Sequence, residues 1–150
     1  MITGFAHSER GARHKEQNIE KQDCSRTVIN FDGTYGIAAV ADGHGGDKYI
    51  RSSKGASFAI DSAIENIENF LIETNYCEMI INKSNREIES KLRHLESAII
   101  NQWRESILKD LEEFPLSSHE NSILVKTYLT QKHSDFAFAK MVFNEATPAF

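Results

Sequence analysis

Five consecutive residues, Asp42-Gly43-His44-Gly45-Gly46, follow an apolar run and carry groups suited to metal-assisted chemistry. An aspartate at the end of a buried strand has a fixed backbone, while the loop after it leaves room for an ion. Gly43 lets the main chain approach closely, so its carbonyl oxygen can face a metal. His44 can donate a proton to a leaving group. The same residues also suit a plain strand-to-helix turn, and this alternative stays open because short motifs often match by chance.

A β-hairpin is expected to position this segment. Arg26–Phe31 is rich in β-branched residues and predicts a strand. Asp32-Gly33 suits a tight hairpin turn because both residues tolerate positive φ. Tyr35–Ala41 is apolar and small, which is typical of a strand buried on both faces, and it ends at Asp42.

The chain before the hairpin is less regular. Met1–Phe5 is apolar enough to predict a short strand. The polar stretch His7–Asp23 predicts a loop. This loop contains four basic side chains, namely Arg10, Arg13, Lys15 and Lys21.

Two long helices are expected after the motif. Apolar residues at three- and four-residue steps from Ala56 to Leu71 predict the first, an amphipathic helix packed on a neighbour. Ser84 and Glu87 have capping-box spacing and predict the start of the second. Pro115 is expected to stop it. We interpret both apolar faces as core.

The rest of the chain gives weaker patterns. Ser117 and Glu120 could cap a further helix over Asn121–Thr130. Phe136–Phe143 fits either a strand or a helical turn, because short apolar runs are ambiguous. Trp103 is interpreted as a packing residue of the second long helix.

Composition and charge favour a soluble, cytoplasmic protein. Hydrophobic residues make up 40% of the 150, which suits one globular domain, and the net charge of −5 provides no basic face for nucleic acid. Cys24 and Cys77 lack the spacing of a zinc site or redox pair and are expected to be reduced thiols. The first residues do not form a signal peptide pattern, and no segment has the apolar length of a membrane span. We therefore expect no nucleic-acid and no membrane partner.

The segment Val40–Gly46, which reads VADGHGG, resembles the signature of PP2C (PPM) phosphatases, a family of metal-dependent serine/threonine protein phosphatases. Gly11-Ala12-Arg13-His14 together with Gln22-Asp23 resembles the first motif of that family, especially in its bacterial branch. The resemblance implies an α/β (α+β) fold, an α-β-β-α sandwich of antiparallel sheets flanked by helices. It covers roughly the first 70 residues well, and beyond them only the two long helices agree.

The resemblance also implies a reaction and its residues. Two Mg²⁺ or Mn²⁺ ions would activate a water that attacks the phosphorus of phosphoserine or phosphothreonine in a phosphoprotein substrate. Asp42 would bridge both metals, and Gly43 would offer its carbonyl to one of them. Asp23 would hold a metal or its waters. His44 would act as general acid for the leaving oxygen, and Arg13 would grip the phosphate with its forked guanidinium.

Two positions depart from the family pattern. Gln22 stands where many members have a glutamate, so this position brings no negative charge to a metal. The spacing from Arg13 to Asp23 is longer than in eukaryotic members. Arg10 or Lys15 could therefore bind the phosphate instead, and each of these cations could also be a solvated loop residue.

The later part of the chain lacks the family's second set of aspartates, and Asp135 is the last aspartate. We expect residues 1–150 to form a single, truncated PP2C-like domain that binds metal weakly and has little or no activity alone. Two alternatives are a catalytically inactive module with a binding or regulatory role and an unrelated metal-binding domain. A partial sandwich would also expose apolar sheet surface and favour self-association.

Overall fold

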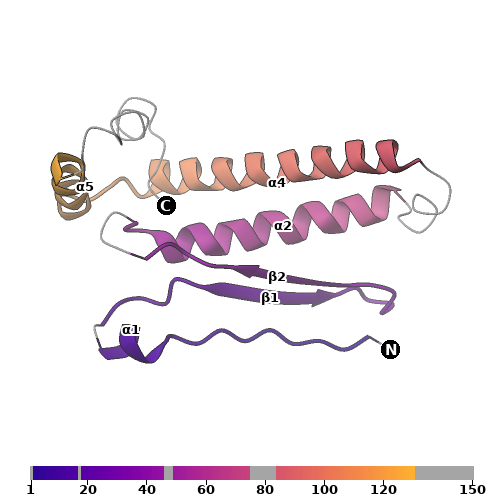
Figure 1. Ribbon diagram of the computed structural model, residues 1–150, viewed down its shortest axis with the longest axis horizontal. Coiled ribbons are helices and arrows are strands. Elements are labelled where there is room, and N and C mark those ends of the chain that lie inside the picture. Colours follow the sequence, from indigo (N-terminus) through magenta and orange to yellow (C-terminus); the bar gives the residue numbers. More distant parts are fainter. Residues whose placement is uncertain (1, 17, 46–48, 75–83, 131–150) are drawn as a thin grey trace.

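The computed structural model describes residues 2–16, 18–45, 49–74 and 84–130 as an α+β arrangement with one antiparallel sheet. The elements are α1 (Ala12–Glu16), β1 (Cys24–Ile29), β2 (Gly36–Ala41), α2 (Ser52–Thr74), α4 (Asn85–Glu113) and α5 (Ser118–Thr130). The layers follow one another in the order hairpin, α2 and α4, and the N-terminal segment lies on the other side of the hairpin (Figure 1). The expected fold class, an antiparallel sheet with two long helices, is confirmed.

The hairpin forms where the sequence predicts it, but its turn is longer than expected. β1 and β2 pair from Ile29 opposite Gly36 to Cys24 opposite Ala41. The amide of Gly33 donates to the carbonyl of Asn30 over 3.0 Å. Gly33 has φ +69°, whereas Asp32 does not have positive φ. The expected tight turn with two positive-φ residues is therefore wrong. A β-turn followed by one left-handed glycine closes the loop instead.

One face of the hairpin packs on α2 and makes the core. Ile37 of β2 is buried against Ile60 and Ile64 of α2, and Ile60 is only 1% exposed. Burying such a side chain contributes about 2 kcal/mol to folding. Val40, which lies on the opposite face of β2, is 82% exposed. The prediction of a strand buried on both faces is therefore wrong for the part of the chain that the structure describes, because α2 covers only one face.

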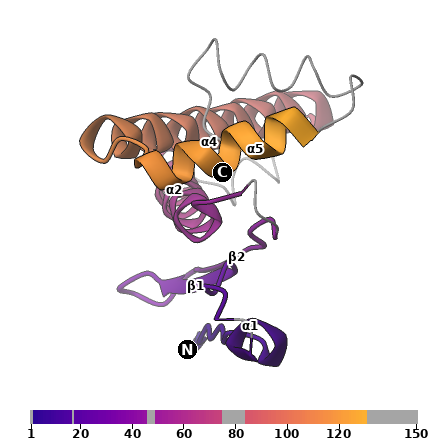
Figure 2. The same cartoon turned by 90° about the vertical axis from the view of Figure 1, so that its left-hand side faces the viewer.

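The second long helix begins and ends as predicted. Ser84 is the N-cap of α4, and both hydrogen bonds of the capping box with Glu87 are present. α4 ends at Glu113, two residues before Pro115. It lies along α2 on the side away from the sheet (Figures 1 and 2). The indole nitrogen of Trp103 donates to the carbonyl of Gly55 over 3.0 Å, which agrees with its interpretation as a packing residue.

The last described helix, α5, runs across the end of α4 (Figure 2). The amide of Glu120 donates to Ser117 Oγ over 3.2 Å, and the amide of Ser117 donates to Glu120 Oε2 over 2.7 Å. These bonds confirm the predicted cap. None of the described helices combines the length and the apolar character needed to cross a membrane. The segment Phe136–Phe143, for which a strand or helical turn was expected, lies outside the described residues.

The N-terminal part differs from the prediction in two ways. Residues 2–5 form no strand, although Ile2 and Gly4 lie close to the hairpin at Gly36 and Thr27. The stretch His7–Asp23, predicted as a loop, contains the five-residue helix α1. This helix is a single turn, so its periodicity is too short to show in the sequence.

Candidate metal and phosphate site

The two aspartates predicted to hold metal lie at the open end of the hairpin. The last ladder pair joins Cys24 to Ala41, so the next position of this register places Asp23 opposite Asp42. Directly opposed residues of antiparallel strands project to the same face, with their β-carbons about 5 Å apart. Both aspartates are exposed. The hairpin thus brings together two carboxylates that are 19 positions apart in sequence.

Close packing at Gly43 shows that the segments before β1 and after β2 stay together beyond the last paired residues, Cys24 and Ala41. A β-carbon on Gly43 would lie 3.0 Å from the carbonyl carbon of Gln22 and still closer to its oxygen. On its other side it would lie 2.6 Å from Ser52 Oγ. No side chain fits there, so position 43 requires glycine for steric reasons. The side-chain oxygen of Gln22 lies near Gly45, and the amide that replaces the family's glutamate therefore faces the same loop.

His44, the predicted general acid, follows Asp42 by two positions and is exposed. Its ring stacks obliquely on the ring of Tyr49, with 4.7 Å between centroids and 31° between the planes. Tyr49 is the first described residue after the gap at residues 46–48 and lies three residues before α2 begins at Ser52. This contact orients the imidazole, which the sequence motif alone did not suggest.

Arg13, the predicted phosphate ligand, is less closely connected. It is an exposed residue of α1, and α1 lies at the end of the hairpin where β1 begins and β2 ends (Figure 1). Within the described residues no hydrogen bond or ion pair joins Arg13 to Asp23, Asp42 or His44. α1 thus lies at the end of the hairpin that carries Asp23 and Asp42 (Figure 1), and the role of Arg13 stays a prediction.

The two alternative phosphate ligands have other neighbours. Arg10 donates a long hydrogen bond of 3.5 Å to the carbonyl of Ile19. Lys15 lies 4.0 Å from a carboxylate oxygen of Glu9, with both side chains more than half exposed. Such an exposed pair stabilises little and leaves the lysine free to move to another anion. The choice among the three cations stays a prediction.

The donor chemistry of the strand ends suits a hard cation, but the number of ligands is small. Asp23, Asp42 and the carbonyl of Gly43 are all oxygen donors, the type that Mg²⁺ and Mn²⁺ prefer. Among the described residues no group of three or more histidine, cysteine or acidic side chains could hold a metal ion. The described part therefore offers two carboxylates and leaves most coordination positions to water or to other ligands.

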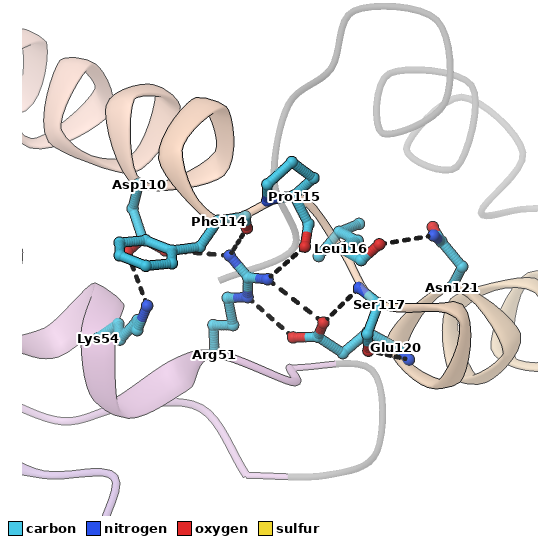
Figure 3. Close-up of polar contacts among 9 residues, drawn as sticks. All are labelled: Arg51, Lys54, Asp110, Phe114, Pro115, Leu116, Ser117, Glu120 and Asn121. Atoms are coloured by element: carbon cyan, nitrogen blue, oxygen red, sulfur yellow. Dashed lines mark hydrogen bonds and ion pairs between the residues drawn. The ribbon is translucent and has the colours of Figure 1, made fainter.

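A second polar cluster, which the sequence did not reveal, lies at the start of α2 (Figure 3). Arg51 donates to Glu120 over 2.9 Å and to Asp110 over 3.0 Å. It also donates to the carbonyl oxygens of Phe114 and Pro115 over 2.8 Å and 3.4 Å. The only signal in the sequence was the predicted cap at Glu120, since nothing there pairs it with a residue 69 positions away.

The electrostatics of this cluster are strong. The side chains of Arg51 and Asp110 are only 10% and 8% exposed. Hydrogen bonds from Arg51 and from the amide of Ser117 lower the pKa of Glu120 to about 2. The same bond to Glu120 raises the pKa of Arg51. Lys54 completes the cluster, because its Nζ lies 2.7 Å from the second oxygen of Asp110.

A comparison with models of protein families identifies the family of the chain. A family model described as protein phosphatase 2C matches residues 10–138, which include both motifs and all the helices described above. Curated proteins and solved structures gave no significant match. The chain therefore belongs to the protein phosphatase 2C family, whose members generally use Mg²⁺ or Mn²⁺ and act on phosphoproteins.

Proposed function

We propose that this chain takes part in the metal-dependent dephosphorylation of phosphoserine and phosphothreonine in proteins, as the N-terminal part of a PP2C-type domain. The observation that carries the proposal is the register of the hairpin, which opposes Asp23 and Asp42 at the strand ends. Membership of the family supports the reaction type. The oxygen-donor character of both residues supports the choice of cation.

In the proposed site each residue has a separate task. Asp42, the carbonyl of Gly43 and Asp23 would hold the cations. A bound Mg²⁺ or Mn²⁺ pair would supply a water of lowered pKa as nucleophile. His44, held by the ring of Tyr49, donates a proton to the serine or threonine oxygen that leaves. Arg13 binds the phosphate oxygens from the side of α1.

A second candidate function is a binding or regulatory module without catalysis. The neutral Gln22 favours it, since an amide brings no charge to balance two cations. The small number of acidic ligands in the described part of the chain favours it as well. In that case the site would bind a cation weakly, and the chain would show no turnover.

Replacing Asp42 by asparagine tests the proposed site. The amide keeps the shape of the side chain but removes its charge, so we expect Mn²⁺ affinity to fall by on the order of tenfold or more. Electron paramagnetic resonance of free Mn²⁺ measures this directly. Glu96→Gln, an exposed substitution on α4, is the matched control and should leave affinity unchanged. Equal Mn²⁺ binding in both variants would contradict the site.

An activity assay separates the two candidate functions. Wild-type protein, Asp42→Asn and Glu96→Gln are incubated with p-nitrophenyl phosphate and with a phosphothreonine peptide in the presence of Mn²⁺. The phosphatase proposal expects turnover, however slow, that Asp42→Asn abolishes and Glu96→Gln retains. Mn²⁺ binding that depends on Asp42, without any turnover, would favour the binding module.

A further inference from the structure

The first turn of α2 connects the proposed metal site to the helical layer. Three consecutive residues, Arg51, Ser52 and Ser53, contact three different parts of the chain. Ser53 Oγ donates to Glu20 over 2.7 Å, which ties α2 to the segment just before β1. Ser52 is 4% exposed, and its hydroxyl lies against the α-carbon of Gly43. Arg51 reaches in the other direction, to α4 and α5.

The contact between Ser52 and Gly43 is a packing contact. The hydroxyl of Ser52 is buried and has no hydrogen-bond partner among the described residues. A buried hydroxyl without a partner costs free energy, so its place is determined by the surrounding backbone and not by its own bonding. Gly43 lies between Ser52 and Gln22 with no room for a β-carbon. We therefore expect a displacement of the first turn of α2 to move the Gly43 peptide.

Arg51 determines where this first turn lies. Its guanidinium donates to the carboxylates of Asp110 on α4 and Glu120 on α5 (Figure 3). It also donates to the carbonyl oxygens of Phe114 and Pro115, which lie between these two helices in the sequence. The planar fork satisfies these acceptors in one orientation only. A flexible point charge such as lysine cannot bridge them together.

We propose that Arg51, through its bond to Glu120, is a positioning residue for the Asp42–Gly43 strand end. It acts on the site through the neighbouring Ser52 and touches neither substrate nor cation. One part of the inference rests on the proposed function, namely that the Gly43 carbonyl and the Asp42 carboxylate are placed to bind a cation. The other part, that the turn between α4 and α5 positions Gly43 through Arg51, does not depend on the proposed function.

The test compares Arg51→Lys and Glu120→Gln with Arg26→Lys. Arg26 pairs with Asp61 of α2 at a site where both side chains are about half exposed, so its variant also alters a contact between α2 and the sheet layer. All proteins are studied at a temperature where circular dichroism shows them folded. One readout is the amide resonances of Gly43 and His44 without metal. The other is the Kd for Mn²⁺, obtained from the paramagnetic broadening of the same resonances.

We expect Arg51→Lys and Glu120→Gln to shift the Gly43 and His44 resonances and to raise the Kd for Mn²⁺ roughly tenfold, as loss of a supporting residue does at metal sites. Arg26→Lys should change neither. If Arg51→Lys does not fold, Glu120→Gln decides alone, because it retains the bond between Arg51 and Asp110.

Two results would overturn the inference. One is a lower Tm with unchanged Gly43 and His44 resonances, and the other is an unchanged Kd for Mn²⁺ in a wild type that binds the ion. Shifted resonances in a protein whose wild type binds no Mn²⁺ would support the positioning role and contradict the proposed function. The two ideas can therefore fail separately.

Discussion

Two pairs of carboxylates lie toward the same end of the molecule, and their surroundings differ completely. Asp23 and Asp42 are exposed at the strand ends, and no cation of the described chain pairs with either. Asp110 of α4 and Glu120 of α5 both pair with Arg51, and Asp110 also pairs with Lys54. The second pair therefore stabilises the packing of α2, α4 and α5, whereas the first pair, which has no such partners among the described residues, is the one proposed to bind a cation.

Removing a neutralised carboxylate should have the largest effect on stability. Asp110→Ala leaves the buried guanidinium of Arg51 with Glu120 as its remaining carboxylate partner, and it removes the partner of Lys54, whose side chain is 45% exposed. We expect the free energy of unfolding to fall by about 2–4 kcal/mol, as for other broken buried pairs. Urea denaturation measures it.

Asp23→Ala is the matched control for this prediction. Its side chain is exposed, and we expect a change within about 0.5 kcal/mol. Equal losses in the two variants would remove the distinction between the pairs.

Acid should weaken the neutralised pair through Glu120. Its pKa is lowered from 4.5 to about 2 in the folded protein, so its contribution is fully present above pH 4.5 and is lost as the pH falls toward 2. After solvent screening we expect about 1–2 kcal/mol from this group. Urea denaturation at pH 6 and pH 3 measures the loss.

Glu120→Gln should flatten this part of the pH dependence, because the amide does not titrate. A variant whose stability falls with acid as steeply as the wild type would show that other carboxylates cause the loss. The comparison uses the difference between the two pH values, so a uniform loss of stability in the variant does not affect it.

Adding charge to the exposed pair should have the smallest effect on stability and a visible effect on cation binding. Gln22→Glu places a third carboxylate beside Asp23, in a side chain that faces the loop at Gly45. We expect Mn²⁺ affinity to rise by roughly three- to tenfold, because ligand charge tunes the affinity of such sites. The free energy of unfolding should change by only about 0.5 kcal/mol. Calorimetric titration with Mn²⁺ measures the first effect, and unchanged affinity would show that residue 22 does not face the cation.

Local patterns were sufficient for the elements that position the site. The β-branched run before Asp32-Gly33 predicted the hairpin, and Ser84 with Glu87 predicted the capping box of α4. Pro115 predicted the end of that helix. Each of these signals depends on residues that are neighbours in sequence, because turns and helix caps are stabilised by interactions within a few residues.

The sequence determined the family, the fold class and the identity of the candidate metal ligands Asp23 and Asp42 and of the candidate general acid His44. Tertiary structure decided which of these lie together, because the register of the hairpin opposes Asp23 to Asp42. It also decided the role of Arg51, whose partners are 59 and 69 positions away. Such contacts depend on how α2, α4 and α5 pack, and no local pattern in the chain encodes the distance between them.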